Sequence, residues 1–554
     1  MTASTTGTAA VVGLGAAGAG LARRLAAAGI RTIGVEPDAA AAARTRRALP
    51  AGAEVTADLS AVAAADVILE AVPEPEPAKR EVLAAISRHR RAGAPVVTTA
   101  LTTPAAELAD AAGGELLALR FARADRLDAA ELARAPHTSD EAAASVAALL
   151  DRAGVRTHTV PDVPGSLAPR LLFGFLNQAA WMRHDGYADR DSLDTAVRLG
   201  CGWAEGPLEI LDAIGHRTAG DILRGLHRRL GDRFTPAPLG TDTADTTNTA
   251  GATARPPEGG AGEPADSGGT VAVIGSGTMA TGIAEVFLRA GYRTVLVART
   301  ERKAVDAREA VEFGLLRAGA DEERLAESLG RWTGTTDLTA AAGAEVVVEA
   351  VVEDLGVKRD LFARLGALCA PGTLLATTTS SLSVRDCAAA SGRPEDVLGL
   401  HFFNPAPAIE LVELVRGEHT GEAALARARA VLARLGRTGV ECADRTGFIV
   451  NALLFPYLND ALAALRHPSV TPALLDSVMK SVGGQPVGPT RLLDVVGADV
   501  ALEVQRRLYE DSGRPGLAPA GLLRNLVDHG FLGRKTSGRG VRAFLADEAR
   551  TGTV

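Results

Sequence analysis

The sequence contains no stretch that approaches the roughly 20 uninterrupted apolar residues a membrane span requires. Its first residues, MTASTTGTAAVVGLG, also lack the basic region followed by an apolar run that marks a secretory signal. We therefore expect neither a membrane-spanning segment nor a signal peptide. A cytoplasmic location is the expectation that follows.

The sequence also lacks a surplus of basic residues and any paired arrangement of cysteines. Its formal net charge of -8 at pH 7 provides no clustered basic surface of the kind that binds nucleic acid phosphates. The four cysteines follow no disulfide or metal-binding spacing; they are Cys201, Cys369, Cys387 and Cys442. These absences argue against a nucleic-acid partner, a disulfide framework and a metal site.

What the chain does have is an order of elements that occurs twice. Its 554 residues exceed what one hydrophobic core usually supports. Each half begins with a strand, a glycine turn, a helix and a second strand, and ends in helical patterns alone. The helical stretch LAPRLLFGFLNQAAWM at 167–182 mirrors IVNALLFPYLNDALAAL at 449–465. The sequence thus predicts an α/β fold, a Rossmann-type doubly wound parallel sheet followed by an all-helical domain, with the pair present twice.

Domain boundaries are predicted where the composition changes. Residues 237–269 are rich in Thr, Ala, Gly and Pro, so they bury too little surface to offset their ordering entropy and indicate a flexible linker. The other predicted domains are a Rossmann-type domain at 1–162, a helical domain at 163–236, a second Rossmann-type domain at 270–446 and a second helical domain at 447–554.

A glycine loop follows the strand TVAVI in the second half and precedes the helix IAEVFLRAG. The backbone N–H groups of such a loop, and the N-terminus of its helix, can approach a pyrophosphate. The predicted cofactor-binding loop is a G-x-G-x-x-A variant and comprises Gly275, Gly277, Thr278, Met279 and Ala280. A tight turn without a ligand is the alternative, but the strand before it and the helix after it favour nucleotide binding.

The end of the next strand bears on which nucleotide binds. An NAD-binding version usually carries Asp or Glu there, which accepts a hydrogen bond from the ribose 2′-hydroxyl. This strand ends VLVARTERK, with Ala298 and Arg299 in that place. Without the carboxylate a 2′-phosphate meets no repulsion, and Arg299 can pair with it. We predict NADP or NAD as the cofactor, with NADP favoured. In the alternative, Arg299 is solvated and the protein discriminates only weakly between the two nucleotides.

The first half carries the fuller NAD-type pattern. It has Gly13, Gly15 and Gly18, and Glu36 closes the strand IGVEPD. Either this half binds NAD, or the residues persist because the turn and the sheet require them. The sequence leaves both open.

His401 and Glu413 are candidates for the chemistry of hydride transfer. Oxidation of an alcohol needs a base for the hydroxyl proton, and a histidine serves in both directions. A carboxylate on the far ring nitrogen would fix the tautomer and stabilise the imidazolium. Judged from these two residues alone, a hydrogen-bonded core histidine and a surface glutamate are more common than a catalytic pair.

The stretch around them, HFFNPAPAIELVELV at 401–415, closely resembles the signature of the 3-hydroxyacyl-CoA dehydrogenase family. The resemblance spans residues 270–545 and continues in VVVEAVVEDLGVKRDLF at 346–362, TTTSSLS at 377–383, DRTGFIVNALLFPYLNDA at 444–461, GPTRLLDVVG at 488–497 and LGRKTSGRG at 532–540. It implies that His401 is the general base or acid and that Glu413 orients it.

The same resemblance implies roles for four further polar residues. Ser380 and Asn451 would donate hydrogen bonds near the substrate oxygen, and Glu353 and Lys358 would line the cofactor side. The alternatives are a helix-capping Ser380, an Asn451 satisfied inside a helix, and an exposed charge pair for the other two. The chain departs from the family pattern at Thr378, Ala280 and Ser537, which indicates a divergent member and leaves an altered substrate open.

In the first half, the corresponding positions carry other residues. Arg120 stands for His401, Thr102 for Ser380 and Pro169 for Asn451. The region opposite Glu413 is Glu131-Leu132, and Glu74 and Lys79 persist. We expect no catalysis from this half. Because the resemblance implies relatives that pair through their helical domains, the first half could supply a partner surface, so an internal pseudo-dimer or a homodimer is expected.

The function expected from the resemblance is reversible interconversion of a 3-hydroxyacyl-CoA and a 3-oxoacyl-CoA, a reaction of fatty acid metabolism, by hydride transfer to or from NAD(P). The second half would hold the active site. Two alternatives stay open. One is a β-hydroxyacid or 3-hydroxyacyl-carrier-protein dehydrogenase of a biosynthetic pathway, and the other is a non-catalytic nucleotide-binding scaffold.

Overall fold

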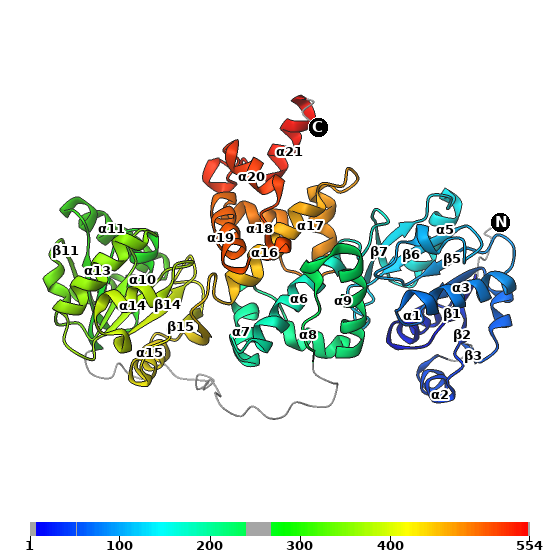
Figure 1. Cartoon of the computed structure of the whole chain (residues 1–554), viewed down its shortest axis with the longest axis horizontal. Coiled ribbons are helices and arrows are strands. Elements are labelled where there is room, and N and C mark those ends of the chain that lie inside the picture. The colour runs from blue at the N-terminus through cyan, green and yellow to red at the C-terminus, as the bar shows by residue number, and fades with distance from the viewer. Residues whose placement is uncertain (1–6, 51–52, 240–267, 552–554) are drawn as a thin grey trace. The chain divides into compact units, whose positions relative to one another are not determined.

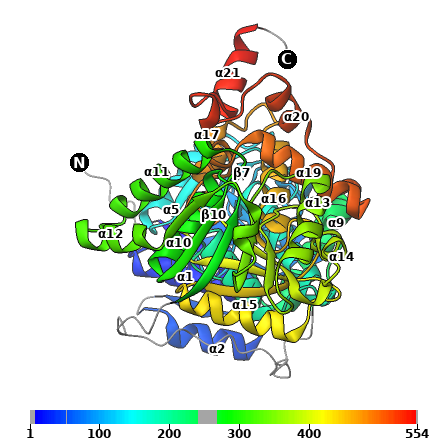
Figure 2. The ribbon, with the colours of Figure 1, turned by 90° about the vertical axis from the view of Figure 1, so that its left-hand side faces the viewer.

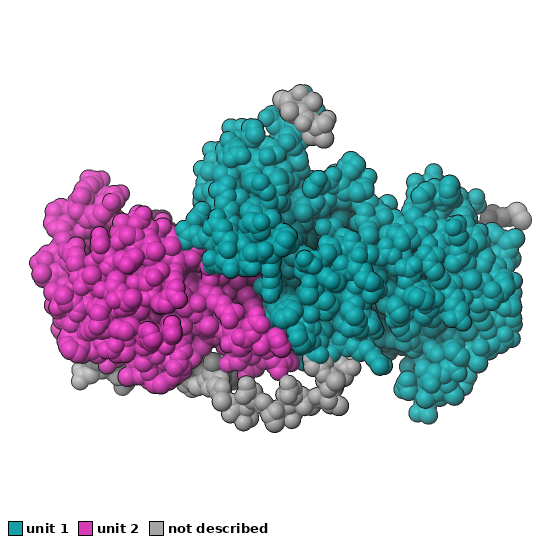
Figure 3. All heavy atoms as spheres, viewed as in Figure 1, with its two compact units in different colours: residues 1–181, 207–245, 455–554 teal, residues 182–206, 246–454 magenta. Residues whose placement is uncertain are grey.

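The computed structural model describes residues 7–50, 53–239 and 268–551. The chain forms two compact units, coloured separately in Figure 3. Unit 1 comprises residues 1–181, 207–245 and 455–554, and unit 2 comprises residues 182–206 and 246–454. Most of the predicted linker at 237–269 lies outside the described residues.

Unit 1 contains an eight-stranded sheet from the first half of the chain, in the order β3-β2-β1-β4-β5-β6-β7-β8. The order reverses between β1 and β4, which is where open α/β sheets bind ligands at the carboxyl ends of their strands. The strands are β1 (Thr8–Val12), β2 (Arg31–Val35), β3 (Glu54–Thr56), β4 (Val67–Glu70), β5 (Val96–Thr98), β6 (Leu116–Arg120), β7 (Ala129–Arg134) and β8 (Arg156–Thr159).

Unit 2 contains a second eight-stranded sheet that repeats this order strand for strand, β11-β10-β9-β12-β13-β14-β15-β16. Its strands are labelled in part in Figure 1 and are β9 (Gly268–Ile274), β10 (Tyr292–Val297), β11 (Trp332–Thr335), β12 (Val346–Glu349), β13 (Leu374–Thr377), β14 (Val397–Phe402), β15 (Leu411–Arg416) and β16 (Thr438–Ala443). The internal duplication predicted from the sequence is therefore confirmed.

Each sheet is mixed, which corrects the prediction of a parallel sheet. Strand β15 runs antiparallel to β14, and β7 runs antiparallel to β6. Only residues 403–410 join β14 to β15. Since a parallel connection needs a crossover of a dozen or more residues, this short segment forces the chain to return antiparallel.

Helices flank both sheets. In unit 1 the flanking helices are α1 (Ala16–Ala27), α2 (Ala39–Ala48), α3 (Glu76–His89), α4 (Ala105–Leu108) and α5 (Asp140–Arg152). In unit 2 they are α10 (Thr278–Arg289), α11 (Glu301–Arg317), α12 (Glu322–Gly330), α13 (Leu355–Leu368), α14 (Val384–Ser391) and α15 (Glu422–Arg434). Figure 2 shows α10 beside β10, and α10 also packs against β9 and α11.

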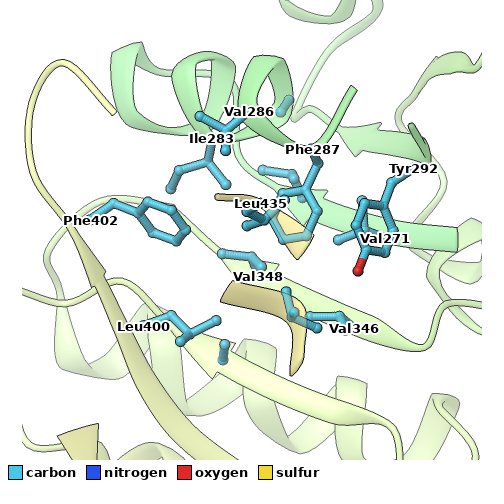
Figure 4. Packing of buried hydrophobic residues seen from close by; sticks show 14 of the residues in the cluster. Val271, Ile283, Val286, Phe287, Tyr292, Val346, Val348, Leu400, Phe402 and Leu435 are labelled. Carbon is cyan, nitrogen blue, oxygen red and sulfur yellow. The ribbon is translucent and has the colours of Figure 1, made fainter. Parts of the chain in front are cut away.

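The core of unit 2 explains why α10 forms where it does. Its apolar positions Ile283, Val286 and Phe287 follow the i, i+3, i+4 spacing of one helix face. They pack into a cluster with strand residues such as Val271 and Val348, as Figure 4 shows. This packing fixes the helix whose N-terminus follows the glycine loop.

The helical regions predicted in each half are also present. The first comprises α6 (Ala168–His184), α7 (Arg190–Gly200), α8 (Pro207–Ile214) and α9 (His216–Leu230). The second comprises α16 (Val450–Ala464), α17 (Pro472–Ser481), α18 (Pro489–Val496), α19 (Ala498–Ser512), α20 (Gly521–Asp528) and α21 (Val541–Thr551). Among the described residues, no helix has the length and apolar character needed to cross a membrane.

Candidate active site

The antiparallel pairing of β14 and β15 brings His401 and Glu413 together. The two residues are direct cross-strand partners, so their side chains project from the same face of the sheet. The Nδ1 atom of His401 lies 2.6 Å from Oε2 of Glu413. His401 is 4% exposed and Glu413 is fully buried. The predicted pair is therefore adjacent and almost dry.

The second carboxylate oxygen of Glu413 is also bound. It accepts hydrogen bonds from the backbone N–H groups of Ile449 and Val450, at 3.0 and 2.8 Å, where α16 begins. A negative charge at a helix N-terminus is electrostatically favourable. One carboxylate thus joins β15, the start of α16 and the His401 ring.

Ser380 completes the group on the other side of the imidazole. Its Oγ lies 3.1 Å from Nε2 of His401. Ser380 stands in the loop after β13, and Glu353 holds this loop: its Oε1 accepts hydrogen bonds from the Thr379 hydroxyl at 2.6 Å and from the Ser380 N–H at 2.9 Å. Three of the four predicted catalytic residues therefore form one hydrogen-bonded series.

A buried acidic residue that the sequence analysis missed anchors Lys358. The Lys358 ammonium lies 2.6 Å from Oε1 of Glu349 on β12 and 3.4 Å from Oε2 of Glu353. Glu349 is fully buried and also accepts a hydrogen bond from the Thr377 hydroxyl at 2.7 Å. The sequence did contain a sign of this residue, because Glu349 ends the otherwise apolar strand VVVE. Contact of Glu353 and Lys358 with the cofactor stays a prediction.

The environment of Glu353 leads to a prediction about pH. Burial opposes the shift, but the Lys358 ammonium and the hydrogen bonds from the Ser380 loop lower the pKa of Glu353 below its ordinary value of 4.5. A carboxyl whose pKa falls on folding stabilises the fold above its unfolded pKa and loses that contribution as the pH falls through its folded pKa. We expect the difference in free energy of unfolding between wild type and Glu353→Gln to be largest above pH 4.5.

Urea unfolding at a series of pH values checks this expectation. The wild-type advantage should shrink steadily as the pH falls below 4.5. Glu418→Gln, at an exposed position, is the matched control and should show no such trend. A difference between wild type and Glu353→Gln that stays constant from neutral to acidic pH would contradict the prediction.

Asn451, the fourth predicted catalytic residue, lies in the first turn of α16 and is partly buried. It directly follows Val450, whose N–H binds Glu413. The structure therefore places Asn451 on α16, the helix whose first N–H groups bind the Glu413 carboxylate. Its hydrogen bond to substrate stays a prediction.

The glycines of the second loop have two different explanations. Gly275 has a φ of +134°, and an added Cβ would lie 2.3 Å from the Ala350 carbonyl oxygen. Gly277 has an ordinary φ of -82°, and its Cβ would meet no atom of the described part of the chain within 4 Å. Packing thus requires Gly275 but not Gly277, which precedes α10 and faces open space. A residue without a Cβ at that place suits close approach of a pyrophosphate.

The remaining predicted cofactor residues lie around this loop. Thr278 and Met279 begin α10, and Ala280 is fully buried beneath the loop. Arg299 follows β10 and is exposed, and the next residue, Thr300, caps α11 by accepting a hydrogen bond from the Lys303 N–H. The guanidinium of Arg299 is thus on a short connection at the carboxyl end of β10.

In the first half, a salt bridge replaces the histidine. Arg120 pairs with Glu131 across β6 and β7, as His401 pairs with Glu413. The Arg120 guanidinium donates to Asp162 at 2.8 Å and to the Ala100 carbonyl at 2.8 Å. Glu131 still accepts from the N–H of Ala168 at the start of α6. The paired strands and the carboxylate at the helix start are thus present in the first half, but the histidine is not.

The structure corrects one correspondence between the halves. Leu101, not Thr102, occupies the place of Ser380, because the Leu101 N–H donates to Glu74 at 2.8 Å just as the Ser380 N–H donates to Glu353. Thr102 instead donates its hydroxyl to Glu74, as Ser381 does to Glu353. The sequence comparison was one residue out of register, and the first half has a leucine without a hydroxyl at the place of Ser380.

The first glycine loop resembles the second in its geometry. An added Cβ on Gly18 would lie 1.9 Å from the Gly13 carbonyl oxygen, whereas Gly15 would meet no atom within 4 Å. The Glu36 carboxylate accepts hydrogen bonds from the N–H groups of Leu14 and Asp38, at 2.8 and 3.0 Å. Packing accounts for Gly18, whereas no atom of the described residues lies close enough to require a glycine at Gly15.

These features define a class of protein. A Rossmann-type sheet presents a glycine loop after β9, and a buried histidine between a carboxylate and a hydroxyl near the carboxyl end of β14. Since β9, β12, β13 and β14 are parallel, both features lie at the same edge of the sheet. This is the arrangement of a nicotinamide-dependent dehydrogenase.

Comparison with known proteins identifies the family. The model of the 3-hydroxyacyl-CoA dehydrogenase NAD-binding domain matches residues 47–162 and 270–445, and that of the C-terminal domain matches residues 165–256 and 447–543. The chain belongs to the 3-hydroxyacyl-CoA dehydrogenase family. Each family domain occurs in it twice, although the first match to the NAD-binding domain begins after the first glycine loop.

Individual relatives align with about half of the chain. A 3-hydroxybutyryl-CoA dehydrogenase of Mycobacterium tuberculosis is 41% identical over 280 residues, which are 50% of this chain and 98% of the relative. The 3-hydroxyadipyl-CoA dehydrogenase of Escherichia coli is 38% identical over 283 residues, which are 50% of this chain and 59% of the relative. The crystal structure of M. tuberculosis FadB2 is 39% identical, covers 49% of this chain and 97% of its own, and has a TM-score of 0.48.

Proposed function

We propose that the second half of the chain reversibly converts a 3-hydroxyacyl-CoA to the 3-oxoacyl-CoA, with NADP as the preferred cofactor. The observation that carries the proposal is the buried His401, held between Glu413 and Ser380 at the edge where the glycine loop lies. The names of the similar proteins support an acyl-CoA substrate. The first half lacks both the histidine and the serine hydroxyl and is proposed to be structural.

The hydrogen bonds assign a role to each ring nitrogen of His401. Because the Glu413 carboxylate can only accept, Nδ1 carries the hydrogen that it donates to Oε2. Nε2 is then the basic nitrogen, and it takes the proton of the substrate hydroxyl during oxidation and returns it during reduction. Glu413 stabilises the imidazolium that forms. When bound, the nicotinamide supplies or accepts the hydride.

Ser380 would stabilise charge on the reacting oxygen. Its Oγ already lies within hydrogen-bond distance of Nε2, so a substrate hydroxyl bound beside both groups would donate to Nε2 and accept a hydrogen bond from Ser380. The Glu353 carboxylate fixes the backbone of this loop before substrate arrives. Such preorganisation lowers the cost of orienting the donor during the reaction.

The test is reduction of acetoacetyl-CoA, followed through the absorbance of the reduced nicotinamide, with acetoacetate as the matched free acid. We expect oxidation of NADPH with the thioester and none with the acid. Turnover of the free acid alone would favour a β-hydroxyacid dehydrogenase. No oxidation of NADPH or NADH with acetoacetyl-CoA would overturn the proposal.

The preference for NADP predicts the effect of reversing the charge at Arg299. We expect Arg299→Glu to lower kcat/KM with NADPH, relative to NADH, by about tenfold to a hundredfold, the range expected when a charged hydrogen bond is lost. Arg302→Glu is the control, since it makes the same change of charge at an exposed position of α11. An equal ratio of the two nucleotides in wild type and Arg299→Glu would argue against the preference.

We also propose that the first half acts as an in-chain partner of the catalytic half. Within unit 2, α7 of the first half packs against β15 and β16. The carbonyl of Tyr187 accepts a hydrogen bond from the Ala443 N–H at 3.0 Å. At the end of α7, a Cβ on Gly200 would lie 2.7 Å from Cγ2 of Val450, whose N–H holds Glu413. The first half thus supports the backbone that orients the catalytic carboxylate.

Two variants test this partnership. We expect the isolated segment 270–554 to lose most of its activity, and Gly200→Val in the full chain to lower kcat because the added methyl groups displace Val450. Asp191→Ala, at an exposed position of the same helix, should leave kcat unchanged. A monomeric, fully active 270–554 segment would contradict the proposal.

A further inference from the structure

Unit 1 contains a cavity that the proposed reaction does not use. Its volume is about 320 Å³, which is at the lower end of the range of small-molecule pockets. It is formed by α6, by the segment after α9 and by the segment after α19. Its lining residues are Asn177, Gln178, Trp181, Asp232, Arg233, Thr235, Gly513, Arg514, Pro515, Gly516 and Leu517.

The two halves of the chain contribute equivalent segments to this region. Asn177 on α6 donates to the Thr235 carbonyl at 2.8 Å and accepts from the Ala237 N–H at 2.9 Å. Asn459 on α16 makes the same two bonds, to the Ala518 carbonyl at 3.1 Å and from the Ala520 N–H at 2.7 Å. Asn177 and Asn459 therefore hold two equivalent segments, 235–237 and 518–520, by the same pair of hydrogen bonds.

This equivalence pairs the neighbouring positions as well. Thr235 matches Ala518, so Arg233, two residues earlier, corresponds to Gly516. Asn177 matches Asn459, so Gln178 corresponds to Asp460. Arg233 forms a salt bridge with Asp460, with Nε 2.9 Å from Oδ2. The equivalent place has Gly516 and Gln178, so it lacks the cation, the anion and the volume of an arginine side chain. Both Gln178 and Gly516 line the cavity.

The charges around the cavity leave an excess of cation. Arg233 is 8% exposed at its side chain, and its Nη2 is buried with no hydrogen-bond partner among the described residues. Asp460 is shared, because Arg170 interacts with it as well. Arg233 and Arg514 both line the cavity, whose lining includes one carboxylate, so the charge of these guanidinium groups would stabilise an anion placed there.

The remaining lining groups indicate what else the ligand carries. Arg514 lies over the Trp181 ring, 5.6 Å from its centre, and brings a second guanidinium to the lining. Trp181 and Leu517 supply apolar surface, and Gln178 supplies an amide. Asp232, the one carboxylate in the lining, is exposed to solvent. The mixture suits an anionic group on a short apolar body.

We propose that this cavity binds a small organic anion, a carboxylate or phosphate ester with a short alkyl chain, at a site separate from the catalytic group of unit 2. The anion would lie near Arg233 and Gln178, and the alkyl chain against Trp181. The site reflects a difference between the two halves, because Gln178 and Gly516 stand in its lining where the equivalent positions carry Asp460 and Arg233. Residues of both halves thereby form the ligand site.

Isothermal titration calorimetry on the full chain tests the proposal, with butyrate, butyl phosphate, inorganic phosphate and the neutral butyramide as probes. We expect saturable binding of butyrate or butyl phosphate, and binding of butyramide at least about tenfold weaker because it lacks the charge. Comparison of the two anions, and of butyl phosphate with inorganic phosphate, identifies the headgroup and the contribution of the alkyl chain.

Two nearly isosteric variants of opposite effect locate the binding. Gln178→Glu restores the negative charge that Asp460 has in the equivalent place and should weaken anion binding about tenfold or more, whereas Asp232→Asn should strengthen it. Acetoacetyl-CoA turnover should be unchanged in both. Each variant is compared with wild type by thermal unfolding, and Asp232→Asn provides the test if Gln178→Glu is unstable.

The contrary outcomes are distinct. Absence of saturable binding with every probe would mean that the cavity holds only water and would overturn the proposal. Equal affinity for butyrate and butyramide would overturn the assignment of an anion. Anion affinity that neither Gln178→Glu nor Asp232→Asn alters would place the binding elsewhere in the chain.

Discussion

Replacing His401 with alanine is expected to lower kcat for acetoacetyl-CoA reduction by about 10²–10⁴-fold, the usual contribution of a general acid or base. Nε2 of His401 is the basic nitrogen directed at Ser380, and the Glu413 carboxylate, fully buried behind the ring, cannot reach the same place. Nucleotide affinity should be almost unchanged, because the glycine loop lies on a different strand. Steady-state kinetics and calorimetric titration of NADPH measure the two effects separately.

A second variant separates chemistry from folding. His401→Ala leaves the buried Glu413 without the donor at Oε2, which destabilises the site in addition to removing the base. His401→Asn keeps an N–H donor near the place of Nδ1 but has no basic nitrogen, so its kcat should fall to a comparable level in a more stable protein. Activity that persists in both variants would move the catalysis to the first half and refute the assignment of His401.

The sequence was sufficient to predict the His401 and Glu413 pair because the residue types themselves indicate its chemistry. An imidazole and a carboxylate on neighbouring strands, within a stretch that resembles a known family, leave few arrangements to consider. The bonds from Ile449 and Val450 to Glu413 could not be predicted in this way. Backbone N–H groups belong to every residue type except proline, so no sequence pattern marks which of them face a carboxylate.

The residue-by-residue correspondence of the two halves and the contacts between distant segments were harder to predict than which residues take part in the candidate site. The correspondence of Ser380 with Leu101 became visible only through the bonds of their N–H groups to Glu353 and Glu74, because Thr102, the next residue, carries a hydroxyl and is the better match by residue type. The packing of α7 against β15 and β16 is also a contact between distant segments, which local periodicity does not encode. Glu349 was missed for a related reason, because its partner Lys358 lies one helical turn inside α13.

Replacing Glu413 with glutamine is the second large effect we expect, with kcat falling by about 10²–10⁴-fold while the fold is retained. Oε1 of Glu413 accepts two backbone N–H bonds, so the oxygen of the glutamine amide must take that place and its NH₂ group must face His401. His401 Nδ1 then has to accept a hydrogen bond, which moves the ring hydrogen to Nε2. The nitrogen that should take the substrate proton is thereby already protonated.

The alanine variant at the same position distinguishes orientation from stability. Glu413→Ala leaves the N–H groups of Ile449 and Val450 without their acceptor in a buried place, at a cost of about 1–3 kcal/mol each, so its thermal unfolding temperature should fall well below that of wild type. Glu413→Gln should unfold close to the wild-type temperature and yet be nearly as inactive as His401→Ala. If Glu413→Gln instead keeps most of its kcat, the carboxylate serves mainly to anchor α16, and the tautomer of His401 must be fixed by another group.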